Sequence, residues 1–587
     1  MSEVAEPLDP QTQENIAQAR SYRGQPSTQY LVPYRNVAHL LELRAQESPD
    51  KVFLIAYDAN GNRTEMTYAE LNERVNQTAN LLANELGVRH GQRVATISYN
   101  SPDTVIIYFA CWKLGAAIAP QNVTEDDSRI AFILRNSESV VAFVRSEYLE
   151  RAERIIHGTE QGLGADNIQR IIQIDGDAQP NYLHYPTALE SQSPKFTPAQ
   201  PATLETESLL VYTSGTTGAP KGVVLVQYNM LVDARGIADW QGLTGNQRLM
   251  NVLPIHHVNG IIVTLITPLY IGGSVVINRQ YQSSTFWKRI AQEKVNVVSV
   301  VPTLLQFSCE YADSQAAAGK SIWGEGVTRD QLAQFRHLIC GAGTLAVALA
   351  KRFEDQFGIP VLHGYGLSET TCYSCYLPIE LDWATHQRWM QDSGYPSIGC
   401  PINGNEMAIF DSEGQMLGSG ERGEICIRGH NVMKYYYQRP DANRETFKFG
   451  WFRSGDEGFY EVGEDQRHYF FITGRIKELI NRGGVKFSPF DIEEVLLEIP
   501  GVKVGLAVAF ENDYYGEEVG AYVVAVEGNS LSESDILAHC RRRMSFEKSP
   551  KVVVFGTDIP VTTTGKYQRL KLRDRFVAWK NTQFRKE

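Results

Sequence analysis

The sequence has few of the features that mark membrane, secreted or nucleic-acid-binding proteins. No apolar run reaches the roughly 18 uninterrupted residues of a membrane-spanning helix, and the apolar stretch 260–277 is broken by Pro268, Gly272 and Gly273. Residues 1–10 contain neither a basic nor an apolar segment, so we expect no secretory signal. The final residues do not form a Ser-Lys-Leu peroxisomal address. These absences predict a cytoplasmic protein without a membrane span.

An excess of basic charge is also absent. The 56 basic and 68 acidic residues give a net charge of −12, which argues against a nucleic-acid partner and against adhesion to anionic membranes. A local basic pocket for phosphates is still compatible with this balance. With 43% hydrophobic and 21% charged residues, the composition is that of an ordinary globular protein.

Cysteine is scarce, and its spacing is not that of a secreted disulfide scaffold. Eight cysteines are spread along the chain, which suits a reducing compartment. Cys372 and Cys375 form one tempting pair, but a structural zinc site needs about four ligands and no second pair completes the set. We expect small pocket-lining thiols here rather than metal or redox chemistry.

The N-terminal two thirds of the chain predict an α/β architecture. Residues 1–35 are polar and rich in proline, so we expect a poorly packed or surface-draped extension. Within residues 36–400, short β-branched runs alternate with helical patterns, such as the helix that begins at the capping-box pair Thr67 and Glu70. Such alternation is typical of helices layered on mostly parallel sheets.

The pattern changes in the last third. Residues 401–476 contain short strands separated by Gly, Asp and Glu turns, which predict an antiparallel, barrel-like subdomain. Residues 477–587 predict a compact α+β domain. At roughly 150 residues per domain, the whole length is compatible with three or four units.

The most informative segment is Tyr212 to Gly222, Tyr-Thr-Ser-Gly-Thr-Thr-Gly-Ala-Pro-Lys-Gly. It follows a predicted short strand, 209–211, so its amides, hydroxyls and single lysine could face an anion. It is not a Walker A loop, because Lys221 lies between Pro220 and Gly222. Taken alone, the composition is equally compatible with a solvated loop and with a phosphate-binding loop.

Further motifs occur downstream in a fixed order. They are Gly341-Ala-Gly343, His363-Gly-Tyr-Gly-Leu-Ser-Glu369, Trp451-Phe-Arg-Ser-Gly-Asp456, Gly474-Arg-Ile-Lys477 with its continuation to Gly484, and Thr564-Gly-Lys566. Together with Tyr212 to Gly222, this series resembles the AMP-forming adenylating enzymes, which include acyl-CoA synthetases, adenylation domains and firefly-type luciferases. The resemblance covers about residues 37–575 and is greatest to acyl-CoA ligases.

The resemblance implies a fold and a reaction. The fold would have a large N-terminal domain of two α/β subdomains and a distorted β-barrel, followed by a small mobile α+β lid. The reaction would adenylate a small carboxylic acid with ATP and then transfer the acyl group to a thiol. CoA is the favoured thiol, because Arg482 to Pro489 resembles the acyl-CoA ligase form of that loop. ATP, Mg²⁺ and CoA, or a carrier-protein phosphopantetheine in place of CoA, are therefore the expected cofactors.

The resemblance also assigns roles to individual residues. Lys566 would bridge the carboxylate and the α-phosphate, and Glu369 with Thr216 would hold Mg²⁺, since two anionic reactants need their charge neutralised. Tyr365 would face adenine, Asp456 would accept the ribose hydroxyls, and Arg475 would contact ribose or phosphate. The remaining expected nucleotide contacts are Thr213, Ser214, Gly215, Thr217, Gly218, Lys221, Gly341, Ala342, Gly364, Gly366 and Ser368.

Two regions would serve the second half of the reaction. Lys477 occupies the hinge position, about which the lid would rotate to bring Gly483 and Gly484 towards the acyl group. Adjacent glycines permit close approach of a pantetheine arm, although they are equally typical of a hairpin turn. Of the basic residues Lys486, Lys548 and Lys551, any could meet CoA phosphates, but for a single one a solvated charge is the simpler interpretation.

The acid is only partly constrained. His257, in Pro254-Ile-His-His-Val-Asn-Gly260, takes the place where acyl-CoA ligases often carry a histidine. The resemblance implies that it gates the acyl pocket or acts in the thioester step, although His256 beside it makes the register ambiguous. Val258 and Asn259 supply no carboxylate for a substrate ammonium, which argues against α-amino acids. The segment 381–391 exceeds the usual family connection, and we expect a loop near the pocket mouth.

Three other functions share parts of this signature. A ligase that loads a separate acyl or peptidyl carrier protein would use the same motifs, as would a luciferase-like oxygenase. A non-catalytic ATP-binding descendant would have lost Lys566, Glu369 or Asp456, and all three are present. Oligomerisation stays open.

Overall fold

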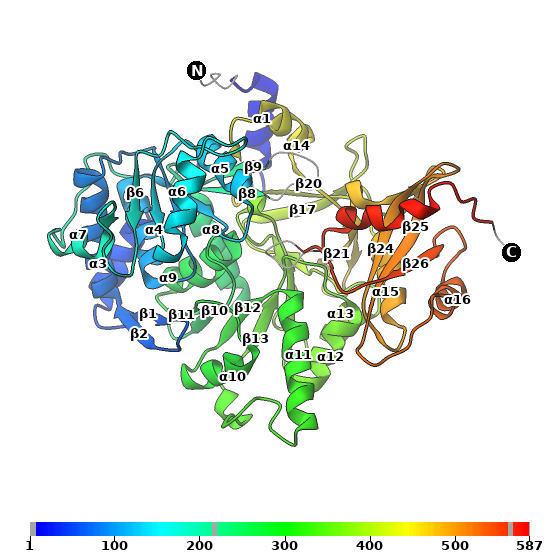
Figure 1. Ribbon diagram of the computed structural model, residues 1–587. Helices are drawn as coiled ribbons and strands as arrows, with labels where there is room; N and C mark the ends of the chain where they lie inside the picture. The colour runs from blue at the N-terminus through cyan, green and yellow to red at the C-terminus, as the bar shows by residue number, and fades with distance from the viewer. Residues whose placement is uncertain (1–6, 214–219, 562–566, 586–587) are drawn as a thin grey trace.

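The computed structural model describes residues 7–213, 220–561 and 567–585. Two large sheets with covering helices form the N-terminal part of the molecule, and the C-terminal elements, orange to red in Figure 1, form a smaller group beside them. This mixed α/β arrangement confirms the predicted fold class. The predicted domain limits at 35, 400 and 476 stay predictions.

The first sheet has eight strands in the order β19-β9-β8-β4-β3-β5-β6-β7. The pairs among β3, β4, β5, β6, β7 and β8 are parallel, whereas β8 and β9 form an antiparallel hairpin. The strands are β3 Arg93–Ile97, β4 Ala117–Gln121, β5 Ser139–Val144, β6 Arg170–Gln173, β7 Leu183–His184, β8 Glu207–Thr213, β9 Lys221–Val226 and β19 Tyr435–Tyr436.

Helices of the first α/β layer begin and end where their sequence signals predict. The Thr67 hydroxyl and the Glu70 carboxylate form a capping box at the start of α3, and Gly115 in the left-handed region ends α4. The helices are α3 Tyr68–Asn80, α4 Pro102–Leu114, α5 Asp127–Asn136, α6 Leu149–His157 and α7 Tyr185–Glu190.

The second sheet has nine strands in the order β16-β15-β14-β13-β12-β10-β11-β1-β2. Its central pairs are parallel and its two ends are antiparallel. The strands are β1 Val52–Tyr57, β2 Arg63–Thr67, β10 Arg248–Asn251, β11 Ser274–Asn278, β12 Val297–Val300, β13 His337–Cys340, β14 Val361–Tyr365, β15 Cys375–Tyr376 and β16 Cys400–Pro401.

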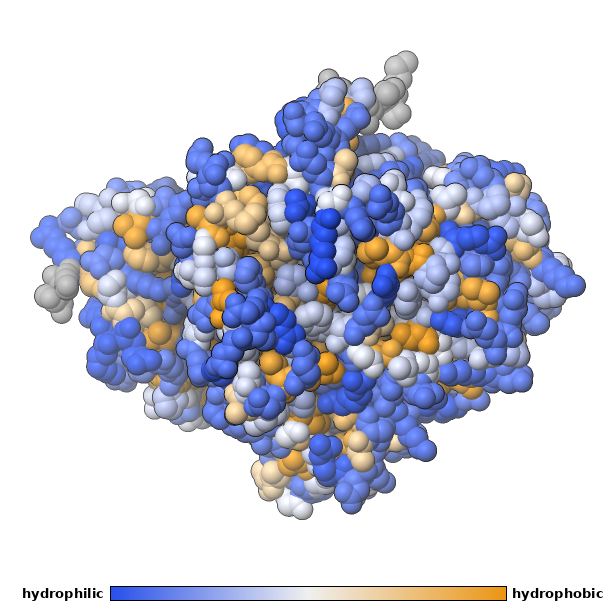
Figure 2. All heavy atoms as spheres, turned by 180° about the vertical axis from the view of Figure 1, so that it is seen from behind, coloured by the Kyte–Doolittle hydropathy of each residue, from blue (hydrophilic) through white to orange (hydrophobic). Residues whose placement is uncertain are grey.

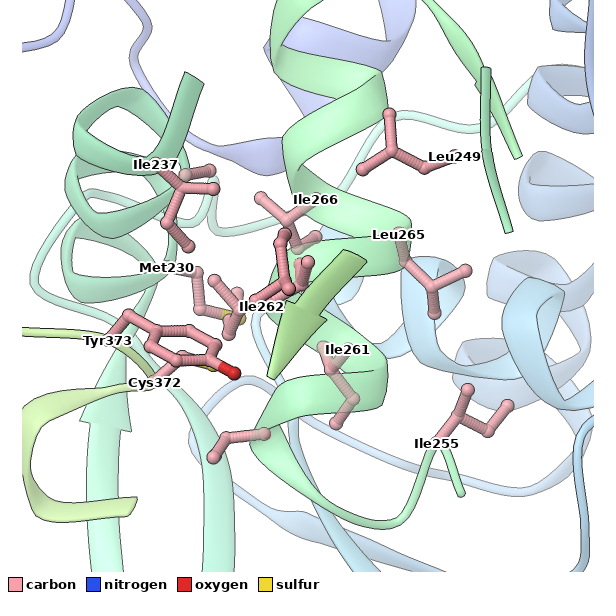
Figure 3. Packing of buried hydrophobic residues seen from close by; sticks show 14 of the residues in the cluster. Met230, Ile237, Leu249, Ile255, Ile261, Ile262, Leu265, Ile266, Cys372 and Tyr373 are labelled. Carbon is pink, nitrogen blue, oxygen red and sulfur yellow. The ribbon is translucent and has the colours of Figure 1, made fainter. Parts of the chain in front are cut away.

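Helices of the second layer share one large apolar core with the first. Figure 3 shows part of it, where Met230 and Ile237 of α8 lie near Ile262 and Ile266 of η3 and near Tyr373. The helices are α2 Val37–Glu47, α8 Gln227–Gln241, η3 Asn259–Ile266, α9 Thr267–Ile271, α10 Ser283–Gln292, α11 Pro302–Ala317, α12 Val347–Phe357 and α13 Trp383–Gln391.

The predicted barrel-like region is a four-stranded antiparallel sheet in the order β17-β18-β20-β21. A bridge between Gly399 and Phe470 joins its β21 edge to the chain just before β16. The strands are β17 Asn405–Phe410, β18 Gly423–Gly429, β20 Phe452–Val462 and β21 His468–Arg475, and the short helix α14 Pro440–Thr446 lies between β19 and β20.

The C-terminal α+β unit has its own small cores, one under each face of its sheet. Strands β24 and β25 pair antiparallel along most of their length, and β26 adds parallel to β25. The elements are β22 Ile480–Arg482, β23 Val485–Phe487, α15 Pro489–Leu497, β24 Val502–Asn512, β25 Gly516–Ala525, α16 Glu533–Arg543, β26 Val552–Phe555 and η8 Arg569–Trp579.

The N-terminal extension lies on the surface and is anchored by a few buried side chains, so it is surface-draped, the second of the two arrangements expected. Residues Pro10–Ala19 form α1, capped by the Asp9 carboxylate, which accepts from the Thr12 amide. Ile16 is 8% exposed and Ala19 is fully buried, and α1 lies beside α14 at the top of Figure 1. The proline at the first helical position starts the helix rather than breaking it.

The segment 381–391 is a helix and not a loop. The Asp382 side chain caps α13, and Trp389 stacks on Tyr469 with ring centroids 3.9 Å apart. The His386 ring lies 2.6 Å from a carboxylate oxygen of Glu354, and both side chains are buried. The helix therefore braces α12 and β21.

The surface carries small apolar groups among polar residues, as the face in Figure 2 shows. Within the described residues, no helix combines the length and the apolar character needed to cross a membrane.

Candidate active site

A cleft of about 1490 Å³ lies where the two large sheets, the β20–β21 hairpin and the C-terminal unit meet. Residues from motifs far apart in the sequence line it together. Those predicted from sequence and found in its lining are Thr213, Lys221, His257, Ala342, Gly364, Tyr365, Gly366, Ser368, Glu369, Asp456, Arg475 and Lys477.

The β8–β9 hairpin brings Thr213 and Lys221 opposite each other at the edge of the cleft. Between them, Ser214, Gly215, Thr216, Thr217 and Gly218 lie outside the described residues. The Lys221 ammonium lies 4.6 Å from the centre of the Tyr436 ring. Burial lowers the pKa of Lys221, and the nearby Glu369 carboxylate opposes that shift.

Glycines around β13 and β14 let the backbone pack against the Cys372–Tyr376 segment. A Cβ at Gly366 would lie 1.8 Å from the carbonyl oxygen of Cys372, and one at Gly341 would lie 2.6 Å from the Tyr373 hydroxyl. Gly341 is thus placed behind the cleft wall and is not part of its lining. Ala342, which does line the cleft, has a positive φ of 64°, a strained conformation for a residue with a side chain.

A buried carboxylate stands at the centre of the site. Asp456, 1% exposed, accepts a hydrogen bond from the Tyr365 hydroxyl at 2.6 Å and lies 3.0 Å from Nε of Arg475. Strands β20 and β21 place Asp456 and Arg475 directly opposite each other. Burial and the Asp456 charge raise the pKa of Tyr365, and the same charge raises that of Arg475.

A second carboxylate, Glu369, is 8% exposed and accepts from the Tyr436 hydroxyl at 2.6 Å. The Met433 amide donates to the Glu369 carbonyl, which fixes its backbone. In the part of the chain that the structure describes, no three His, Cys, Asp or Glu residues cluster as a ready metal site. Glu369 therefore offers one carboxylate and would need other oxygen ligands from a substrate.

Two adjacent histidines line the cleft at the start of η3. The His256 and His257 ring centroids are 4.4 Å apart. Burial lowers the pKa of His256 far below its usual range, and His257 adds to the shift. Nε2 of His256 is buried and has no hydrogen-bond partner among the described residues.

The C-terminal unit closes one side of the cleft. Lys477 and Glu478 line it from the short helix η7 Ile476–Glu478, and Tyr567 and Arg569 line it from the end of the chain. Arg569 pairs with the buried Glu493 at 2.6 Å and with Glu478 at 3.3 Å. Lys566, the predicted catalytic lysine, lies outside the described residues.

Gly483 and Gly484 are placed elsewhere. They form the two-residue turn between β22 and β23, with φ values of 58° and 92°, and they are exposed. Positive φ at both positions is the conformation that favours glycine in such turns. Neither glycine lines the cleft in this arrangement of the lid, and their predicted role at the thiol stays a prediction.

Of the three lysines considered for CoA phosphates, only Lys486 is exposed. Lys548 forms an ion pair with Asp491. The Lys551 side chain is 1% exposed and lies 3.5 Å from Glu518, and burial lowers its pKa to about 8. Lys548 and Lys551 thus serve contacts within the lid.

Cys372 and Cys375 are buried in the core, and neither is among the residues that line the cleft. The expectation of pocket-lining thiols is therefore wrong. Both thiols pack in the core, and burial raises the pKa of each well above its usual range, which is typical of structural cysteines.

Several lining residues were missed by the sequence analysis. They are Tyr436, Arg439, Asp441, Glu478, Glu493 and Arg569. Tyr436 sits in a run of three tyrosines, Tyr435 to Tyr437, whose only sequence signal was a concentration of hydroxyls beside basic residues.

Comparison with known families divides the chain into two matched parts. Residues 41–437 match the family described as "AMP-binding enzyme", and residues 491–566 match its C-terminal domain. An oxalate–CoA ligase of Arabidopsis thaliana is 30% identical over 92% of this chain and 98% of its own length. A sulfoacetate–CoA ligase of Cupriavidus necator is 31% identical over 92% and 97%.

Solved structures show the same architecture. The anthranilate CoA ligase AuaEII in complex with anthranoyl-AMP superposes with a TM-score of 0.78 at 25% identity, covering 94% of this chain and 98% of that one. ATP-bound MatB from Rhodopseudomonas palustris has the same TM-score at 24% identity, with 92% and 99% covered, and is a likeness of fold.

Proposed function

Because the chain belongs to the family of AMP-binding enzymes, we propose that it is an AMP-forming ligase that joins a small carboxylic acid to CoA. The single observation that carries the proposal is the convergence of motifs from residues 213 to 569 on one cleft. The two relatives named above, an oxalate–CoA ligase and a sulfoacetate–CoA ligase, match this chain over nearly their whole length. The resemblance found in the sequence is thereby confirmed at the level of the family.

The reaction has two balanced steps. A carboxylate oxygen attacks the α-phosphorus of ATP, a new P–O bond forms, and pyrophosphate leaves to give the acyl-adenylate. The CoA sulfur then attacks the acyl carbon, AMP leaves with the C–O bond pair, and the thiol proton is released. Both reactants of the first step are anionic, so the site must offset their repulsion where water screens poorly.

The nucleoside half of ATP is assigned to the Tyr365, Asp456 and Arg475 group. A buried carboxylate has spare lone pairs beyond those used by the tyrosine hydroxyl and the guanidinium, and ribose hydroxyls can donate to them. The Tyr365 ring, held by its hydroxyl, presents a fixed aromatic face beside them. Lys221 and Thr213 are assigned to the phosphate half, on the β8–β9 hairpin.

Mg²⁺ fits the donor set through Glu369. Mg²⁺ is commonly held by one or two carboxylates together with substrate phosphates rather than by an all-protein cage, and Glu369 is a single buried carboxylate in the cleft. The bound ion would neutralise phosphate charge. The Tyr436 hydroxyl orients the Glu369 carboxylate for this purpose.

The lysine that would neutralise the reacting carboxylate is Lys566. Its sequence neighbours Tyr567 and Arg569 line the cleft, which supports the assignment. A carrier-protein thiol in place of CoA and a luciferase-like oxygenase are not favoured, since the relatives named above are CoA ligases. A cytoplasmic location and any oligomeric state stay predictions.

The test is an assay that measures every product of the reaction. Purified protein with ATP, Mg²⁺, CoA and a candidate acid should produce AMP, pyrophosphate and an acyl-CoA thioester in equal amounts, with equal loss of free thiol. Replacing CoA by a phosphopantetheinylated carrier protein should give little thioester. Production of ADP instead of AMP, or thioester formed only on the carrier, would refute the proposal.

A further inference from the structure

The inner wall of the cleft, beside the two histidines, is closed by apolar packing. Helix η3 begins two residues after His257 and packs against α8. Figure 3 shows Met230 and Ile237 of α8 facing Ile262 of η3, while Ile261 lies on another side of η3. All four are fully buried. No described residue of α8 or η3 is among those lining the cleft. A long alkyl chain would have to displace this packed interior.

Tyr373 fills the space on another side of the same wall. It is 2% exposed, and its ring stacks on Tyr376 with centroids 4.4 Å apart. Its hydroxyl lies so close to Gly341 that a Cβ there would be only 2.6 Å away. The turn from Gly341 to Gly343 therefore rests on a filled interior, which limits the depth available to an acyl group.

The polar groups inside this wall satisfy one another. The Ser299 hydroxyl donates to Asn259 Oδ1 at 2.8 Å, and Asn259 Nδ2 donates to the Tyr373 hydroxyl at 3.2 Å. All three residues are buried. Each of these groups therefore has a hydrogen-bond partner within the wall.

His256 differs from them. Among the described side chains that line the cleft, two have a buried polar atom without a hydrogen-bond partner, Nε2 of His256 and Oδ1 of Asp456. The Asp456 oxygen faces the Arg475 guanidinium at 3.0 Å, so its charge is compensated. Nε2 of His256 has neither a hydrogen-bond partner nor an ion pair among the residues that the structure describes. Leaving a buried polar group unpaired is unfavourable, and a ligand that pairs with it would recover that cost.

We propose that the acid substrate is short and carries a second oxygen group, which hydrogen-bonds to Nε2 of His256. The inference rests on the proposed ligase function and names the class of acid that this site takes. Hydroxyl, carboxylate and sulfonate groups share the required chemistry, because each places an oxygen within reach of an imidazole N–H. The closed wall excludes long alkyl chains, and the unpaired nitrogen disfavours a bare short alkyl chain.

Burial of the His256 ring also favours an acid with a second oxygen group. Desolvation lowers the pKa of His256, which favours the neutral form of its ring. In that form one ring nitrogen donates and the other accepts. Nε2–H can then bind a substrate oxygen without the cost of burying an imidazolium.

The experiment compares acids of matched length by ATP–pyrophosphate exchange. The panel is propionate, lactate, malonate, sulfoacetate and octanoate. We expect kcat/KM for at least one of the three oxygen-bearing acids to exceed that for propionate by about tenfold or more, the ratio that one recovered hydrogen bond supplies. Octanoate should be the poorest substrate. The three oxygen-bearing acids separate hydroxyl, carboxylate and sulfonate as the group recognised.

The substitution His256→Phe keeps the size of the ring and removes the polar nitrogen. It should lower the ratio of kcat/KM for the preferred acid to kcat/KM for propionate about tenfold or more, and measurable exchange with propionate reports a folded, adenylating enzyme. His157→Phe, on the exposed side of α6 with its side chain 59% exposed, is the matched control and should leave both values unchanged.

Three results would count against the inference. If octanoate or propionate is the best substrate, the acid class is wrong although the ligase function stands. If His256→Phe lowers the rates with propionate and with the preferred acid equally, His256 does not read the second group. If no acid in the panel or in a wider panel supports exchange, the ligase function itself fails.

Discussion

At the scale of single residues, Asp456 links two other members of the site. It is nearly inaccessible to water, yet its two oxygens hold the Tyr365 hydroxyl and the Arg475 guanidinium. Such a carboxylate is oriented before the nucleotide arrives, which lowers the entropic cost of binding.

Asp456→Asn should therefore weaken AMP binding. The amide is neutral and turns one acceptor into a donor, so two ribose hydroxyls lose a charged partner, at about 1.5–3 kcal/mol for a hydrogen bond to a charged group. We expect a rise of roughly 10- to 100-fold in the Kd for AMP, measured by titration calorimetry. Tyr365→Phe removes only the positioning hydrogen bond and should raise the Kd less. Equal affinity of Asp456→Asn and the wild type would show that ribose binds elsewhere.

Glu369 and Tyr436 make a second residue-scale prediction. Tyr436→Phe removes the hydroxyl that orients the Glu369 carboxylate, and loss of such a partner typically costs 10- to 100-fold in metal affinity. The Mg²⁺ concentration for half-maximal AMP formation should rise at least about tenfold, and Glu369→Gln should raise it further. Tyr437→Phe is the control, because its hydroxyl donates to Glu138 instead. If neither Tyr436→Phe nor Glu369→Gln changes the Mg²⁺ concentration for half-maximal AMP formation, Glu369 is not a metal ligand.

The sequence predicted the members of the Tyr365, Asp456 and Arg475 group but not their contacts. The order of the motifs identifies Tyr365 and Asp456, which are 91 positions apart in the sequence. Their hydrogen bond depends on how β14 and β20 are placed in the fold, which the motifs do not give. Tyr436 had no motif of its own, and tyrosine is too common in cores for its position to be informative. Contacts of this kind follow from tertiary packing.

At the scale of elements, the segment that follows α1 makes hydrogen bonds to two distant parts of the chain. The Gln25 carbonyl accepts from His430, whose other ring nitrogen lies 2.6 Å from the Tyr228 hydroxyl, and the Leu31 amide donates to that hydroxyl. Because a carbonyl can only accept, Nε2 of His430 carries the proton and Nδ1 accepts from Tyr228. The extension thus ties α8 to the end of β18.

Ile16→Ala should destabilise the protein through α1. The side chain is 8% exposed and packs into the main core, and truncation of a buried isoleucine to alanine costs about 2–5 kcal/mol. The value here should lie near the lower end, because α1 is at the margin of the core. Denaturant unfolding monitored by tryptophan fluorescence measures the change in the free energy of unfolding. The exposed Glu14→Ala on the same helix should stay within about 0.5 kcal/mol of the wild type, and an equal effect of both would contradict the packing.

Local signals explain which elements were predictable. The capping box at Thr67 fixed the start of α3, and the glycine after Leu114 fixed the end of α4. Comparable signals existed for α1 and α13, in Asp9 before Pro10 and in Asp382. They were outweighed by the polar, proline-rich composition of one segment and by the unusual length of the other, neither of which reports on helix formation.

At the scale of the whole molecule, polar contacts join the C-terminal unit to the second α/β layer. Lys503 of β24 forms an ion pair with Glu310 of α11 at 3.0 Å. A carboxylate oxygen of Glu494, in α15, accepts from the Val347 amide at the N-terminus of α12 at 3.4 Å. Phe490 of α15 also packs into the main core, so apolar as well as polar contacts join the C-terminal unit to the rest. Rotation of this unit between the two steps of the reaction stays a prediction.

Glu494 should make this arrangement sensitive to pH. Burial raises its pKa to about 7, with Glu493 and Glu498 adding to the shift, while the Val347 amide opposes it. A carboxyl whose pKa is raised in the folded protein stabilises the fold fully at pH below its ordinary value, and this contribution is lost as the pH rises towards 7. Above pH 7 the buried charge is a cost that glutamine would not carry. Glutamine can still accept from the Val347 amide.

Glu494→Gln should consequently raise the melting temperature more at pH 8.5 than at pH 6, by roughly 2 °C for each kcal/mol relieved. Thermal unfolding at pH 6, 7 and 8.5 in one ionic strength measures the difference. Glu511→Gln, an exposed carboxylate paired with Lys580, is the matched control and should shift the melting temperature equally at the three values. A wild type whose stability falls no faster with pH than that of Glu494→Gln would mean that this carboxylate is solvated. The contact with α12 would then not bias the position of the lid.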